Sequence, residues 1–223
     1  MRKFLHDRSL ALVLALLTLV ILGGQSFAGH RNYNEQQMQM HSSTISYPRY
    51  LVSSDFYDNV MSNWQSEFLQ ISLYVIFAVW FRQRGSAVSR NLRDPEKSTE
   101  EQELLGAHLR PGSPPWARAG GWRLKLYENS LLLAMAALFF LSWFAMAVTE
   151  RNVYNQQQQF FKQPPVRLLD FLGTSYFWNK TLQNWQSEFL AVGVFAVATI
   201  YLRQRGSTES KPVGAAHHWT GSD

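Results

Sequence analysis

The chain has 223 residues, of which 46% are hydrophobic and 14% aromatic, and its net charge is +5. It contains no cysteine, so disulfides, thiolate nucleophiles and cysteine-ligated metal sites are excluded. The length would suit one or two soluble domains, but the apolar residues are gathered into four runs, which favours a membrane protein.

The first predicted element is a spanning helix over residues 10–28, an apolar run without charge that follows a basic start. Its small-residue end, Ser26-Phe27-Ala28, is also typical of a signal-peptide cleavage site. A similar uncharged run at residues 131–148 lies inside the chain and cannot be a signal peptide. We therefore expect the first run to be retained as a helix.

Two shorter apolar runs cover residues 68–81 and 189–202. A helix of this length spans roughly 21 Å, less than the roughly 30 Å of a hydrocarbon core, so each run crosses a membrane only with its preceding turn included. That turn belongs to the heptapeptide NWQSEFL, which stands at residues 63–69 and again at 184–190. Ser54 and Ser175 are expected to cap the helices that contain it. The alternative, a soluble bundle of four buried helices, is disfavoured because the other two runs have no polar face.

Positive charge is distributed unevenly between the segments that separate these runs. Fifteen of the 21 Lys and Arg residues lie before the first run, between the second and third runs, or after the fourth. The positive-inside rule therefore predicts that both termini and the middle loop are cytoplasmic, with the heptapeptides at the outer face. The predicted location is the inner cell membrane, in a multi-pass arrangement.

The sequence repeats itself at an offset of 121 residues. The offset pairs the two heptapeptides, the RQRGS segments at 82–86 and 203–207, and the two Tyr-Asn pairs that begin at Tyr33 and Tyr154. The predicted fold class is an all-α membrane protein, with four transmembrane helices from a tandem duplication of a two-helix unit and a parallel pseudo-twofold along the membrane normal. The predicted domains are repeat 1 at residues 1–90, a cytoplasmic linker with an amphipathic lead-in at 91–127, and repeat 2 at 128–223.

The heptapeptides are predicted to face each other and to form one polar site at the outer interface. Their tryptophans fit the aromatic belt of a membrane. A carboxylate at the membrane edge often marks an ion or proton path, although a glutamate solvated by headgroups is the simpler alternative. The candidate residues are Asn63, Trp64, Gln65, Glu67, Asn184, Trp185, Gln186 and Glu188. The expected inner-face anchors, at the predicted helix C-termini, are Arg82, Arg84, Arg203 and Arg205.

No catalytic motif can be read from the chain. No histidine lies within an apolar run, and there is no glycine-rich phosphate loop, readable Ser-His-Asp arrangement or metal-ligand spacing. We therefore expect no catalytic residue, no metal and no cofactor. Because the basic residues follow the predicted topology, the expected partner is the lipid bilayer and not nucleic acid. Other membrane proteins, or a second copy of the chain, stay open as partners.

The doubled NWQSEFL and RQRGS segments, with the GAH and GGW stretches of the middle loop, resemble a family of bacterial multi-pass membrane proteins of unassigned function. The resemblance covers essentially the whole chain and implies a membrane location without an activity. Two functions stay open. One is a non-enzymatic envelope or assembly component that acts through its outer loops. The other is a small proton- or cation-linked transporter or channel that uses Glu67 and Glu188.

Overall fold

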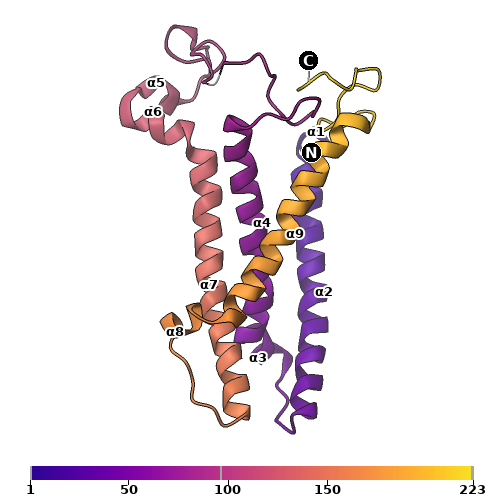
Figure 1. Ribbon diagram of the computed structural model, residues 1–223, viewed down its shortest axis with the longest axis vertical. Coiled ribbons are helices and arrows are strands. Elements are labelled where there is room, and N and C mark those ends of the chain that lie inside the picture. The colour runs from indigo at the N-terminus through magenta and orange to yellow at the C-terminus, as the bar shows by residue number, and fades with distance from the viewer. Residues whose placement is uncertain (1, 96, 222–223) are drawn as a thin grey trace. The chain divides into compact units, whose positions relative to one another are not determined.

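The computed structural model describes residues 2–95 and 97–221, and within these residues all regular structure is helical (Figure 1). The all-α part of the predicted fold class is therefore confirmed. The helices are α1 (Arg2–Asp7), α2 (Ser9–Gln39), α3 (Tyr47–Leu51), α4 (Ser54–Trp80), the 3-10 helix η1 (Gly106–His108), α5 (Pro115–Ala119), α6 (Gly121–Glu128), α7 (Ser130–Phe160), α8 (Leu168–Leu172) and α9 (Ser175–Tyr201).

Two helices in the described part of the chain, α2 and α7, are long and apolar enough to cross a membrane. Each has 31 residues, so the two predicted apolar runs continue as helix into the glutamine-rich segments that follow them. Only 6% of the apolar window of α2 and 22% of that of α7 is buried. A core helix of a soluble protein would be mostly buried, so these helices present their apolar side chains to the surroundings.

The helix bounds recur at the same offset as the sequence matches. Helices α2 and α7 have 31 residues each, α3 and α8 have five, and α4 and α9 have 27, and each pair begins 121 residues apart. The predicted caps of α4 and α9 were wrong by one residue. The side chains of Ser53 and Thr174 accept the hydrogen bonds from the backbone N–H groups of Phe56 and Phe177, respectively, each at 3.2 Å. The hydroxyl of Ser54 instead accepts a hydrogen bond from Asn152.

The chain divides into two compact units, and each contains segments of both predicted repeats. The first unit comprises the residues up to Met61 together with Ala145–Gly173, and the second comprises Ser62–Phe144 together with the residues from Thr174 onward. Helices α4 and α7 therefore each contribute one part to the first unit and one part to the second.

The first unit contains two matching asparagine clasps. The Asn34 side chain donates to the carbonyl of Ile45 (3.0 Å) and accepts from its N–H (2.9 Å). Asn155 does the same with Val166, at 3.0 and 2.8 Å. Each clasp closes the loop after a long helix by replacing a backbone partner with a side-chain amide. A buried ring lies beneath each loop, Tyr50 in one and Phe171 in the other.

Candidate functional site

The two heptapeptides contact each other in the second unit, where α4 lies against α9. The indole N–H of Trp185 donates to the side-chain carbonyl of Gln65 at 2.9 Å, and Asn184 donates to the carbonyl of Ser62 at 3.2 Å. The hydroxyl of Ser66 donates to the carboxylate of Glu188 at 3.3 Å. Because Gln65 is fully buried, its bond to Trp185 satisfies a polar group that would otherwise be costly to bury.

The two heptapeptides contribute residues from different positions to this contact. Of the predicted site residues, Gln65, Asn184, Trp185 and Glu188 take part in the bonds between the helices. The other four, Asn63, Trp64, Glu67 and Gln186, are exposed. The two glutamates therefore have different surroundings, since Glu67 is exposed while Glu188 is half-buried against Ser66 and its backbone carbonyl accepts from Gln70.

An aromatic cluster supports Trp185 from α7. The ring of Trp143 lies 6.2 Å from that of Trp185, 5.9 Å from Phe177 and 6.0 Å from Phe139. Aromatic pairs at these separations stabilise a contact beyond the area they bury. The sequence prediction missed Trp143, and Ser66, a polar residue of the first heptapeptide, was not among the candidate site residues. Trp143 is the only tryptophan within the apolar run at 131–148, and this was the available signal.

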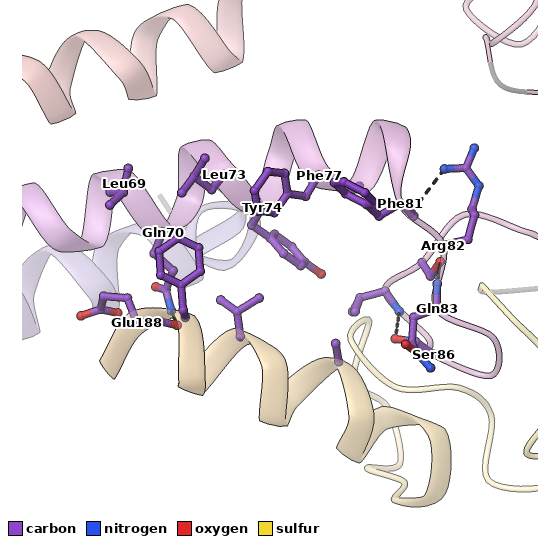
Figure 2. A pocket seen from close by; sticks show the side chains of 16 residues that line it. Leu69, Gln70, Leu73, Tyr74, Phe77, Phe81, Arg82, Gln83, Ser86 and Glu188 are labelled. Atoms are coloured by element: carbon purple, nitrogen blue, oxygen red, sulfur yellow. Dashed lines mark hydrogen bonds between the residues drawn. The ribbon is translucent and has the colours of Figure 1, made fainter. Parts of the chain in front are cut away.

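An apolar groove of about 220 Å³ begins beside this contact and follows α4 (Figure 2). Figure 2 shows Glu188 at one end of the groove and Arg82 at the other. Its walls are the apolar side chains of α4 and α9, and polar residues gather at the Arg82 end. The lining residues are Leu69, Gln70, Leu73, Tyr74, Phe77, Ala78, Phe81, Arg82, Gln83, Ser86, Val88, Ser89, Glu188, Phe189, Val192 and Ala196.

A second cleft, also of about 220 Å³, lies in the first unit between the ends of α2 and α7. Five glutamines line it, and Asp55 is the carboxylate among its lining residues. Burial and then the charge of Asp55 raise the pKa of Tyr50 to about 12, and the Tyr50 hydroxyl hydrogen-bonds to Asp55. The remaining lining residues are Tyr33, Met40, Ser42, Val153 and Phe160, and the glutamines are Gln36, Gln37, Gln156, Gln157 and Gln159.

The four predicted inner-face arginines follow α4 and α9 and differ in their contacts. Arg203 donates from one guanidinium nitrogen to the carbonyls of Thr199, Ile200 and Leu202, and from another to that of Ala215 at 3.0 Å. Arg82 donates to the carbonyls of Val79 (2.9 Å) and Phe81 (3.4 Å) through a single nitrogen. Arg84 and Arg205 are exposed. Both Arg82 and Arg203 thus satisfy terminal helix carbonyls.

Lys211 is a buried cation that the sequence prediction missed. Its ammonium donates to the carbonyls of Gly85 (2.6 Å), Ala216 (3.2 Å), His217 (3.0 Å) and Trp219 (2.9 Å). The bond to Gly85 ties the segment after α9 to the loop after α4, and the other three bonds close that segment on itself. Burial, and then the charge of Arg203, lower the pKa of Lys211. The four carbonyl oxygens offset part of the cost of burying the charge.

Within residues 2–95 and 97–221, no group of three or more His, Asp or Glu side chains is placed to hold a metal ion. The side chains that join the two heptapeptides are amides, an indole, a hydroxyl and a carboxylate. Such groups can bind a ligand and can also pack the helices together.

The fold and these sites define an all-helical protein with two helices able to cross a membrane. The chain belongs to the family described as Domain of unknown function (DUF6766), whose model matches residues 1–222. This confirms the predicted membership of a family without an assigned function. No curated protein and no solved structure matches the chain.

Proposed function

We propose that the protein is a non-enzymatic, multi-pass membrane component that acts through its outer segments. The observation that carries the proposal is the glutamine-lined cleft of the first unit, which the glutamine-rich segments after both Tyr-Asn pairs help to form. A glutamine amide donates and accepts hydrogen bonds but does not transfer protons near neutral pH. The five glutamines therefore suit the cleft to binding a polar partner.

The membrane arrangement in this proposal has four spans and arises by tandem duplication. Three observations support it: the recurring helix bounds, the two asparagine clasps, and a pair of left-handed residues, His41 and Lys162, that are also 121 residues apart. Helices α4 and α9 would each cross the membrane with their heptapeptides at the outer face. Both termini and the loop between α4 and α7 would then be cytoplasmic.

The absence of cysteine from the chain makes this topology directly testable. We expect single Ser43→Cys and Gln163→Cys variants to react with a membrane-impermeant maleimide in intact cells. Glu101→Cys and Thr208→Cys should react only after the membrane is permeabilised, because the positive-inside rule places them in the cytoplasm. All four residues are exposed, so burial does not limit the reaction. Labelling of Glu101→Cys in intact cells would contradict the four-span arrangement.

The same chemistry tests whether the outer cleft is occupied in the cell. Gln157 lines the cleft, whereas Gln163 is exposed on the same outer segment outside it. We expect Gln157→Cys to react several-fold more slowly than Gln163→Cys in intact cells, because a bound partner covers the cleft. The two rates should become similar in purified protein. A rate ratio that is the same in cells and in detergent would end the proposal that the cleft is the acting surface.

A proton- or cation-linked transporter is the second candidate, and one contact favours it. Glu188 is a half-buried carboxylate between α4 and α9, and it lines the apolar groove. This candidate requires flux across liposomes that depends on Glu67 and Glu188. A flux assay on the wild type and on the Glu67→Gln/Glu188→Gln double variant separates the two functions, since a non-enzymatic component gives no flux in either protein.

A further inference from the structure

The apolar groove of the second unit has the length and the lining of a site for a hydrocarbon chain. It follows α4 from Leu69 to Phe81, which is roughly 18 Å at 1.5 Å per residue. One leaflet of a bilayer is roughly 15 Å of hydrocarbon, half of the core thickness. Side chains such as Leu73, Phe77 and Val192 form its walls. A ligand that fills the groove must therefore be apolar along most of its length.

The two ends of the groove differ in charge, which sets the orientation of a ligand. At one end, Arg82 uses one guanidinium nitrogen for helix carbonyls, and no hydrogen bond within the described residues uses its other two. At the opposite end lies the carboxylate of Glu188 (Figure 2). An anionic headgroup is attracted to the first end and repelled from the second. Arg203 is less available to a headgroup, because both of its terminal guanidinium nitrogens already donate to carbonyls, four in all.

We propose that this groove holds one acyl chain of an anionic phospholipid, with the lipid phosphate on Arg82 and the chain directed toward Glu188. The proposal rests on the proposed membrane placement of α4 and goes beyond it by assigning a ligand class. Arg82 follows directly after the last turn of α4, at the level where the inner headgroups lie in the proposed topology. An arginine at this depth binds phosphate through its remaining donors while its stem lies along apolar surface.

The test compares how two lipids are retained by the purified full-length protein. We would reconstitute it in nanodiscs of equal parts phosphatidylglycerol and phosphatidylcholine, extract it in mild detergent, and count bound lipids by native mass spectrometry. We expect one retained phosphatidylglycerol, favoured about fivefold over phosphatidylcholine, since one arginine near the headgroups is worth about 1 kcal/mol. Arg82→Gln should abolish the preference. Arg84→Gln, which removes the same charge at an exposed position outside the groove, should retain it.

A second pair of variants tests the apolar part of the site. Ala196→Phe places a ring in the groove and should remove retention of both lipids, whereas Val197→Phe lies on the exposed side of α9 and should not. Equal retention of the two lipids, or retention unchanged in Ala196→Phe, would overturn the proposal. So would a stable dimer in which a second copy covers the groove. Maleimide labelling of the same variants shows separately whether the membrane topology is intact, so failure of the lipid site is distinguishable from failure of the proposed topology.

Discussion

Replacing Lys211 with Met is expected to release the C-terminal segment from the loop after α4. The methionine side chain cannot donate to the carbonyls of Gly85, His217 and Trp219, which all accept from the ammonium at 3.0 Å or less. Removing one partner of a buried charged network costs on the order of 3–5 kcal/mol. The segment can avoid most of this cost by exposing the carbonyls to water, so it should open locally while the helices remain folded.

Hydrogen exchange would measure this opening at two backbone amides. The N–H of Gly85 donates to the hydroxyl of Thr220 at 2.9 Å, and the N–H of Gly221 donates to the carbonyl of Ser86 at 3.0 Å. We expect their protection to fall by roughly 100- to 1,000-fold in Lys211→Met. Arg205→Met removes a positive charge from an exposed position of the same segment and serves as the control. Unchanged protection in Lys211→Met would show that the carbonyl contacts do not hold the segment.

Gly29→Ala is expected to destabilise the first unit, and Tyr50→Phe is expected to rescue it. A Cβ at position 29 would collide with the hydroxyl of Tyr50, a residue that is fully buried. The ring of Tyr50 cannot easily move, because the rings of His30, Tyr33 and Phe56 surround it at 5.7–5.8 Å. Overpacking of this kind costs about 1–3 kcal/mol, whereas the gain in helix propensity is roughly 1 kcal/mol at most.

The chain contains a natural version of the rescue. At the positions 121 residues later, the glycine is replaced by Glu150 and the tyrosine by Phe171, which has no hydroxyl. A larger residue on the long helix therefore coincides with a smaller ring beneath the loop, and both Glu150 and Phe171 are fully buried. This exchange supports a steric coupling between the two positions.

Thermal unfolding in detergent would measure the coupling through a double-mutant cycle. We expect Gly29→Ala and Tyr50→Phe each to lower the melting temperature. The double variant should be more stable than the sum of the two changes predicts, by about 1–2 kcal/mol. Gly24→Ala on the same helix is the matched control, because no atom lies within 4 Å of a Cβ built there. Strictly additive effects would contradict the steric explanation.

The helices were predicted from local sequence patterns, namely apolar runs and capping residues. The apolar runs at 10–28 and 131–148 lie within α2 and α7, because long apolar runs without Pro or charge favour helix. The predicted caps were nevertheless displaced by one residue, since Ser53 and Ser54 offer the same hydroxyl. Only the local backbone conformation decides which of two neighbouring serines accepts the N–H.

The particular side chains that meet between the two heptapeptides could not be read from the sequence. The heptapeptides are identical, yet Gln65 is buried while its counterpart Gln186 is exposed. The rotation of each helix about its axis decides this difference, and that rotation depends on neighbours such as Trp143 rather than on the heptapeptide itself. The same reason explains why Glu67 and Glu188 have different surroundings.

The sequence by itself determined the helical class, the location of the two long apolar helices and the family, because each of these depends on periodicity, hydrophobicity or residue identity along the chain. Only the tertiary structure decided which polar groups meet. The bond from Lys211 to Gly85 joins residues 126 positions apart, and the bond from Trp185 to Gln65 joins residues 120 apart. Such pairs leave no local pattern, since their proximity is set by how whole helices and loops pack together.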